Sequence, residues 1–207
     1  MLENKTLIML VAPSAMGKTT IMSAAIELDR DFGYVRSFTT RAPRASDQFY
    51  WYVSKNEAYE LRKNGKSLTY VEHPTTGDIY GTTLESYEAK YNLLDTLSSS
   101  IASYTSLSFA ATHIISITTS PKIWREWFRQ RYPEPTGEAL KRLDEAKLSI
   151  QWSLAQTSAH AWVINDSTPH NAAQKLIGIA KGETDGDRSV PTARAILELL
   201  ESEAMWL

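Results

Sequence analysis

The fold of this chain is decided by the run Leu7-Ile8-Met9-Leu10-Val11 and by the loop Ala12-Pro13-Ser14-Ala15-Met16-Gly17-Lys18-Thr19 that follows it. Five consecutive apolar residues without polar alternation are typical of a strand buried on both faces, as in a parallel sheet. The residues from about Lys18 to Leu28 favour a helix. The chain therefore opens with a strand, a loop and a helix.

The loop carries the residues of a phosphate-binding turn. Such a turn directs successive backbone N–H groups at phosphate oxygens, and the helix behind it adds its positive N-terminal end. Lys18 supplies a point charge for β- and γ-phosphates, and Thr19 offers a hydroxyl to Mg²⁺. The candidate triphosphate-binding residues are Ala12, Pro13, Ser14, Ala15, Met16, Gly17, Lys18, Thr19 and Thr20. The alternative is a plain strand-to-helix turn.

Two details bear on this interpretation. Ala12 stands where the usual pattern has its first glycine, and alanine there costs roughly 1–2 kcal/mol if that position requires a positive φ. A second Gly-Lys-Ser triplet, Gly65 to Ser67, follows a helical stretch instead of a strand. We interpret Gly65 as the C-cap of that helix, not as part of a phosphate loop.

The alternation of strands and helices continues along the chain. Short apolar runs precede helical stretches, which favours an α/β fold with a mainly parallel sheet flanked by helices. The expected later strands are residues 91–94, 113–118 and 162–164, and the expected later helices are 138–155, 171–179 and 192–206. In the helix 138–155 we expect Leu140, Leu143, Ile150 and Leu154 to form the buried stripe.

Two segments interrupt the alternation. Residues 36–82 combine strand-like pieces with a helical piece at 56–64, which predicts a small inserted α/β subdomain. The segment from about 125 to 138 is rich in arginine and lacks a steady period, which predicts a loop or lid. We expect one domain over residues 1–181, with its core at 1–35 and 83–181. A linker and an amphipathic helix, packed on the domain or in a dimer contact, follow at 182–207.

Composition excludes several classes of protein. The 207 residues carry a formal net charge of −2, so no global positive field attracts nucleic acid or an anionic membrane. There is no cysteine, which excludes disulfides, thiolate metal sites and cysteine nucleophiles. No stretch has the length of a membrane span or of a signal-peptide core. We expect a cytoplasmic protein with neither a nucleic-acid nor a membrane partner.

Residues 37–44 carry a candidate anion site. Arg41 and Arg44 flank Pro43, and two guanidinium groups on a stiff segment suit a small dianion such as a 5′-monophosphate. Taken alone, the pair would more often be two solvated surface arginines than an anion site.

The order of these motifs resembles that of guanylate kinases, over about residues 5–181. The matching segments are Pro13-Ser14, Ser37 through Arg44, Tyr50-Trp51-Tyr52-Val53, Glu72, Tyr80-Gly81-Thr82, Lys141-Arg142-Leu143 and Val163-Ile164-Asn165-Asp166. The Thr-Thr-Arg-x-Pro-Arg core is the most specific of them. The resemblance implies a P-loop kinase that moves a phosphoryl group from ATP to GMP with Mg²⁺.

The resemblance also implies roles for single residues. Ser37, Glu72 and Thr82 would read the guanine edge, and Asn165 would lie near the adenine of ATP. Lys18 and three arginines would be catalytic. The GMP-binding residues would be Ser37, Arg41, Arg44, Tyr50, Glu72, Tyr80, Gly81 and Thr82, and the catalytic residues Lys18, Arg41, Arg131 and Arg142. Beside Thr19, we expect Asp95 as an outer-shell Mg²⁺ partner.

The chain departs from the family pattern at several positions. Ala12 and Ala15 replace glycines, the segment after Arg44 is short, and Leu97 stands where a second acidic residue is usual. Trp127 stands where a lid arginine is usual, with Arg125 and Arg129 as alternatives. These departures leave open a diverged kinase of another monophosphate, a binding module without turnover, and, last, nucleic-acid binding. We expect a monomer or a homodimer.

Overall fold

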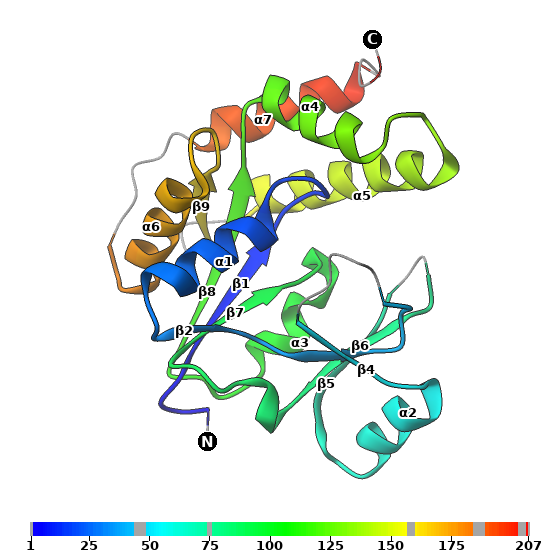
Figure 1. The fold of residues 1–207 in the computed structure, drawn as a ribbon, viewed down its shortest axis with the longest axis vertical. Helices are drawn as coiled ribbons and strands as arrows, with labels where there is room; N and C mark the ends of the chain where they lie inside the picture. The colour runs from blue at the N-terminus through cyan, green and yellow to red at the C-terminus, as the bar shows by residue number, and fades with distance from the viewer. Residues whose placement is uncertain are drawn as a thin grey trace. The chain divides into compact units, whose positions relative to one another are not determined.

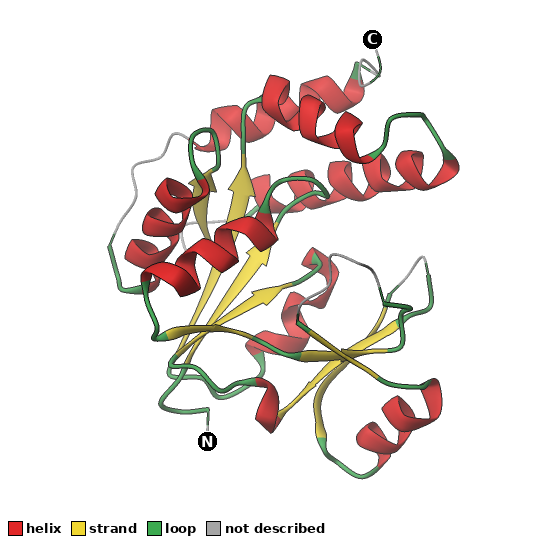
Figure 2. Ribbon diagram, in the orientation of Figure 1, coloured by secondary structure: helices red, strands yellow, loops and turns green. Residues whose placement is uncertain are grey.

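The computed structural model describes residues 2–43, 49–73, 76–156, 160–183, 189–202 and 206. Strands and helices alternate along it as predicted (Figures 1 and 2). The strands are β1 (Thr6–Val11), β2 (Phe32–Tyr34), β3 (Ser37–Thr39), β4 (Tyr50–Tyr52), β5 (Ser67–Glu72), β6 (Ile79–Thr83), β7 (Tyr91–Asp95), β8 (Ala111–Thr118) and β9 (His160–Ile164). The helices are α1 (Lys18–Leu28), α2 (Lys55–Lys63), α3 (Ile101–Thr105), α4 (Pro121–Arg131), α5 (Gly137–Leu154), α6 (Pro169–Ala180) and α7 (Ser189–Glu201), with short 3₁₀ turns at Leu84–Ser86 and Ser98–Ser100.

Five strands form the sheet that carries the phosphate loop, in the order β2-β7-β1-β8-β9. The pairs β2–β7 and β8–β9 run parallel. Leu7 to Val11 of β1 are buried, as expected for a strand covered on both faces. Helices α1 and α6 pack against each other beside the strands (Figure 1). The predicted strand-loop-helix opening and the parallel α/β sheet are confirmed.

A second sheet of four strands has the order β4-β3-β6-β5, with β3–β4 parallel and the other pairs antiparallel. Phe38, Ala58 and Ile79 form its core under α2. That helix begins with a capping box between Ser54 and Glu57. The helix ends at Lys63, and Gly65 just beyond it has a left-handed backbone with φ 66°. The N–H groups of Gly65 and Lys66 bond back to the last turn, so the interpretation of Gly65 as a capping glycine is confirmed.

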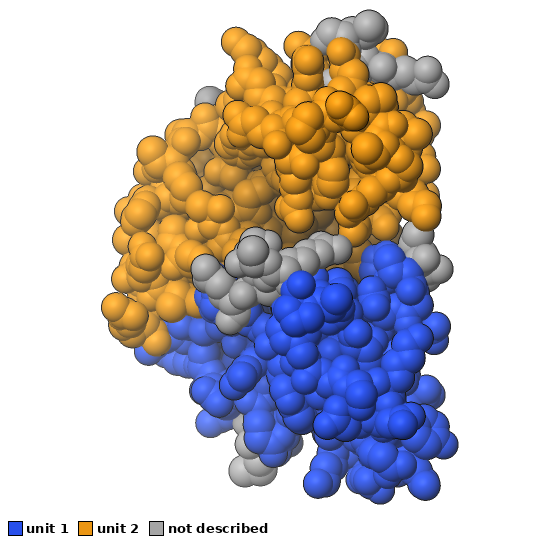
Figure 3. All heavy atoms as spheres, turned by 45° about the vertical axis from the view of Figure 1, so that its right-hand side comes forward, with its two compact units in different colours: residues 1–7, 31–94, 99–112 blue, residues 8–30, 95–98, 113–207 orange. Residues whose placement is uncertain are grey.

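The chain divides into two compact units, which Figure 3 shows in different colours. Unit 1 comprises residues 1–7, 31–94 and 99–112, and unit 2 comprises 8–30, 95–98 and 113–207. Unit 1 is larger than the predicted insertion 36–82. One reason is that Val35 and Arg36 donate backbone hydrogen bonds to Leu93 and Ser86, 2.9 and 3.2 Å long. The predicted subdomain is therefore joined to β7 and the turn before it.

The structure corrects the predicted lid. Residues 125–131 are not a loop but the main part of α4, and only 132–136 connect it to α5. Ser120 caps α4, Pro121 fits its first turn, and Trp124 and Phe128 are buried one turn apart. The signal was the spacing of Trp124, Phe128 and Tyr132, which repeats every four residues along one helix face.

The predicted stripe of α5 is confirmed at Ile150, which is buried, and Leu143 and Leu154 are half-buried. It is wrong at Leu140, which is 49% exposed, and it omits the buried residues Ala139, Ala146 and Ser153. Helix α7 packs on α5 as well as on α4 and β9 (Figure 1). In α7 the buried residues are Ala193 and Ile196. The last helix therefore packs on the rest of unit 2, the first of the two predicted alternatives.

In the part of the chain that the structure describes, no helix is both long enough and apolar enough to cross a bilayer.

The burial of α7 predicts that it is needed for stability. Ile196 is fully buried, so Ile196→Ala should lower the free energy of unfolding of unit 2 by about 2–4 kcal/mol. Leu148→Ala is the control, because Leu148 is 65% exposed and should change stability by about 0.5 kcal/mol or less. The measurement is urea unfolding followed by circular dichroism. Equal midpoints for both variants would show that α7 contributes no core.

Candidate active site

The phosphate loop joins the end of β1 to the start of α1. Two of its residues have left-handed backbone conformations, Ala15 with φ 62° and Gly17 with φ 82°. Turns of this kind let neighbouring N–H groups converge on an anion. No side chain caps the N-terminus of α1, which leaves its first N–H groups for a ligand. The loop therefore has the backbone of an anion-binding site.

The strain expected at Ala12 lies elsewhere. Among the described residues other than glycine, only Ala15 has a positive φ. The cost of about 1–2 kcal/mol therefore falls on the middle of the loop. The side chains of Pro13 and Met16 are buried, so these residues can offer a ligand only backbone groups, and Pro13 has no N–H.

Asn165 holds the end of the loop. Its side-chain nitrogen donates to the carbonyl oxygen of Met16 (3.1 Å), and its backbone N–H continues the sheet by donating to Thr118 (2.7 Å). A Cβ on Gly17 would lie 2.4 Å from the same nitrogen, so only glycine fits there. Asn165 is 5% exposed. Asn165 thus fixes the backbone of the loop at Met16 and Gly17. Its predicted contact with adenine stays a prediction.

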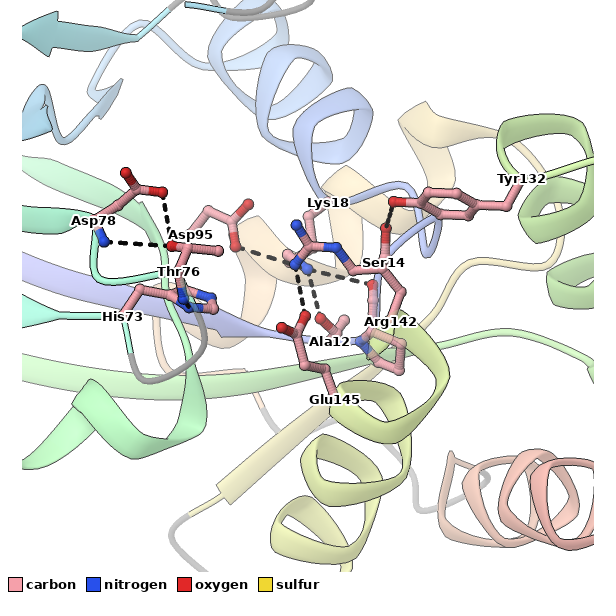
Figure 4. Close-up of polar contacts among 11 residues, drawn as sticks. Ala12, Ser14, Lys18, His73, Thr76, Asp78, Asp95, Tyr132, Arg142 and Glu145 are labelled. Carbon is pink, nitrogen blue, oxygen red and sulfur yellow. Dashed lines mark hydrogen bonds and ion pairs between the residues drawn. The ribbon is translucent and has the colours of Figure 1, made fainter. Parts of the chain in front are cut away.

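Helix α4 holds the other side of the loop. The indole of the buried Trp124 donates to the carbonyl oxygen of Ser14 (3.0 Å). The Tyr132 hydroxyl lies 3.4 Å from the Ser14 hydroxyl (Figure 4). Both contacts join segments more than a hundred residues apart, so the sequence pattern does not predict them. Trp206 extends this cluster by packing edge-on against Phe128 and donating to the carbonyl oxygen of Tyr132.

Lys18 lies at the mouth of the loop. Its ammonium donates to the carbonyl oxygens of Ala12 (2.6 Å) and Pro13 (3.4 Å) and lies 3.7 Å from the Asp95 carboxylate (Figure 4). Thr19 and Thr20 follow on exposed positions of α1. Among the described residues there is no group of three or more acidic or histidine side chains that could hold a metal ion by itself.

The predicted lid arginines belong to α4 and α5. Arg142 donates to Glu145 (2.6 Å), and both side chains are mostly buried. Burial opposes the charge of Arg142, but the hydrogen bond and charge of Glu145 outweigh it, so the pKa of Arg142 is raised. Arg131, at the end of α4, is exposed and lies over the Tyr132 ring at 5.7 Å. Because its pKa is raised, Arg142 is charged at every working pH.

Unit 1 brings three of the predicted GMP-phosphate residues together. The Arg41 guanidinium lies 5.2 Å from the centre of the Tyr50 ring, and the Tyr50 and Tyr80 rings meet edge to face at 6.1 Å. Strand register explains the grouping, since Ser37 pairs with Tyr50 and Thr39 with Tyr80. Arg44 lies outside the described residues.

The threonines of the Thr-Thr-Arg motif position this group. The Thr39 hydroxyl accepts from the backbone N–H of Arg41 (3.2 Å). The Thr40 hydroxyl accepts from the N–H of Ile79 (2.9 Å), which ties the motif to β6 beside Tyr80. Gly81 is packed so closely that a Cβ would lie 2.2 Å from the Phe38 ring. Gly81 is therefore required for sheet packing. Its predicted contact with GMP could involve only its backbone and stays a prediction.

The three predicted guanine-reading residues differ in access. Glu72 is exposed at the end of β5, and Ser37 is 5% exposed. Thr82 is fully buried, and its hydroxyl lies 2.8 Å from both the Thr69 and Tyr87 hydroxyls. Burial raises the pKa of Tyr87 far above its usual value, so this chain of hydroxyls stays neutral. In this structure Thr82 thus stabilises the sheet core, and its predicted contact with guanine stays a prediction.

The backbone of the loop predicts how single glycines should act. Ala15→Gly should raise the free energy of unfolding by up to about 1 kcal/mol, because it removes the left-handed strain. Ala12→Gly is the matched control and should lower it by about 0.5–1 kcal/mol, because only chain entropy changes. Thermal or urea unfolding measures both. A shift of the same sign in the two variants would contradict this assignment of the strain.

Comparison with known proteins agrees with this geometry. The guanylate kinase family model matches residues 4–179. The guanylate kinase of Listeria monocytogenes serotype 4b is 28% identical over 189 residues, which cover 88% of this chain and 91% of that protein. Guanylate kinase 1 of Arabidopsis thaliana is 29% identical over 83% of this chain and 47% of its own length.

Among solved structures, guanylate kinase from Anaplasma phagocytophilum has the same fold, with a TM-score of 0.60 at 18% identity over 100% of this chain and 97% of that one. The family match ends before α7 begins. It contains the phosphate loop, the cluster around Arg41 and the arginine of α5. The predicted membership is confirmed: this chain belongs to the guanylate kinase family.

Proposed function

We propose that this chain transfers the γ-phosphoryl group of ATP to GMP and forms ADP and GDP. The observation that carries the proposal is the phosphate loop of unit 2, with its left-handed turns, a helix N-terminus that no side chain caps, and Lys18 beside them. A module that only binds a phosphorylated ligand has no use for such a triphosphate site.

The phosphate loop of unit 2 would bind the phosphates of ATP mainly through backbone groups and a few side chains. Backbone N–H groups of the loop would hold the β-phosphate, and Lys18 would exchange its loop carbonyls for β- and γ-phosphate oxygens. Mg²⁺ fits the residues present, because it is usually held by one or two protein oxygens together with substrate phosphates. Thr19 would coordinate it and Asp95 would act through water, and the ion would neutralise charge on the transferring phosphoryl group.

The acceptor half lies in unit 1. Arg41, Tyr50 and Tyr80 would bind the GMP phosphate, with Arg44 as a further predicted partner. The oxygen of that phosphate is already a nucleophile near neutral pH, so the reaction needs no general base. Arg131 and Arg142 would stabilise the transferring group, and Arg142 would first have to leave Glu145. Catalysis would thus rest on positioning and on positive charge.

Recognition of guanine would rest mainly on Glu72. A carboxylate can accept from the N1–H and the 2-amino group of guanine together, and adenine offers no such pair of donors. Ser37 of β3 pairs with Tyr50 of β4 and is the second predicted contact with guanine. Because Thr82 is buried in its hydroxyl chain, it would not discriminate between bases. A cytoplasmic location and a monomeric or dimeric state stay predictions.

The direct test is an assay of ADP formation with ATP, Mg²⁺ and one monophosphate at a time. We expect turnover with GMP and little with AMP, CMP or UMP. Lys18→Ala should lower it by a factor of about 100 or more, because a charge aimed at the transferring group is lost. Turnover with another monophosphate only would point to a diverged kinase. Binding of GMP without turnover would contradict the enzyme and favour a binding module.

A pair of variants tests base recognition. Glu72→Gln should lower kcat/KM for GMP by roughly 10- to 100-fold, because the amide cannot accept from both guanine donors. Thr82→Val should leave kcat/KM within about threefold while lowering stability by roughly 1–3 kcal/mol, because Thr69 and Tyr87 lose their shared partner. An equal loss of guanine preference in both variants would refute the assigned role of Thr82.

A further inference from the structure

Trp127 lies beside the end of the phosphate loop. Its ring carbon Cζ3 is 4.0 Å from the point where a Cβ of Gly17 would stand, and the Asn165 side-chain nitrogen is 2.4 Å from the same point. Trp127 is neither buried in the core of α4, like Trp124, nor fully exposed. A partly exposed indole therefore stands at the N-terminus of α1, next to the proposed triphosphate site.

The chemistry of a nucleoside triphosphate places its base near this point. In phosphate loops the lysine reaches the β- and γ-phosphates, while the loop and helix N-terminus hold the α- and β-phosphates. The base then follows one ribose beyond the α-phosphate, on the side of the helix N-terminus. A planar aromatic surface there can bind any base through its π-face.

Unpaired polar groups mark the same end of the sheet. The Thr118 and Thr119 hydroxyls are at most 2% exposed and have no hydrogen-bond partner among the described residues. The carbonyl of Thr118 accepts from Asn165, the residue that abuts Gly17. Ligands of parallel α/β sheets bind at the carboxyl ends of the strands. Thr118 is the last residue of β8, and Thr119 follows it. Buried hydroxyls without partners are rare and indicate a group that the protein alone does not supply.

We propose that Trp127 is the stacking surface for the nucleobase of the phosphoryl donor. This rests on the proposed function, because it assumes that the loop of unit 2 binds a nucleoside triphosphate. The indole, at a position where the family usually has an arginine, would bind the base through its contact area. Since stacking tolerates every base, Trp127 should strengthen ATP and GTP binding alike.

The test compares ATP with inorganic tripolyphosphate, which has no base, by calorimetric titration of the full chain in the presence of Mg²⁺. Trp127→Leu should weaken ATP binding by about tenfold or more and leave tripolyphosphate binding within about twofold. Trp127→Phe should retain most of the ATP affinity, because it keeps an aromatic face. Trp51→Leu, which removes an exposed tryptophan of β4, is the matched control and should change neither.

Intrinsic fluorescence gives a second readout. A base stacked on Trp127 should change the emission of the native protein when ATP is added, and this change should disappear in Trp127→Phe. Unchanged ATP affinity in Trp127→Leu would overturn the proposal, as would an equal loss for ATP and tripolyphosphate. A native protein that binds ATP without turning over GMP would sink the proposed function and leave this assignment standing; failure of native protein to bind ATP would overturn both.

Discussion

The carbonyl groups of the phosphate loop must be held away from the anion, and the rest of unit 2 depends on that constraint. A loop that binds phosphate through its N–H groups cannot also turn carbonyl oxygens toward it. Here the Ser14 carbonyl accepts from Trp124 and the Met16 carbonyl accepts from Asn165. Gly17 is required because the Asn165 amide occupies the space of a Cβ. Two distant side chains thus fix which way the loop faces.

This constraint explains why α4 and the last helix matter to the phosphate loop. Trp124 belongs to α4, whose aromatic face continues through Phe128 to Trp206, and α7 packs on α4 and α5. The same arrangement carries Arg142 on α5. In unit 1, Thr39 and Thr40 accept hydrogen bonds from the backbone N–H groups of Arg41 and Ile79. These bonds fix the backbone at Arg41 and next to Tyr80.

The sequence predicted the features that depend on local pattern and on the order of the motifs. The apolar run before Gly17-Lys18-Thr19 identified the strand-loop-helix opening, and the order of motifs identified the family. It did not predict features set by contacts between distant segments. Periodicity predicts Leu140 in the core of α5, yet Leu140 is exposed and the neighbouring Ala139 is buried. The arginines of α4 suggested a polar loop, although Trp124 and Phe128 form a buried helix face.

The same limit applied to side chains of the site. The sequence places Thr82 in the right motif, but only the strand pairing shows that its hydroxyl meets Thr69 and Tyr87. Likewise, the family pattern suggests strain at Ala12, where a glycine is usual, whereas the residue with the left-handed backbone is Ala15. Chemistry-bearing residue types can be predicted from order and spacing, whereas the direction in which each side chain points is decided by its neighbours in the folded chain.

The central claim is that the loop of unit 2 binds ATP so that its terminal phosphoryl group passes directly to GMP. The most direct measurement follows the label of γ-³²P-ATP in a single turnover with GMP and identifies the labelled product. Direct transfer predicts that the label appears in the β-position of GDP. Label found only in inorganic phosphate, or retained in ATP, would contradict it.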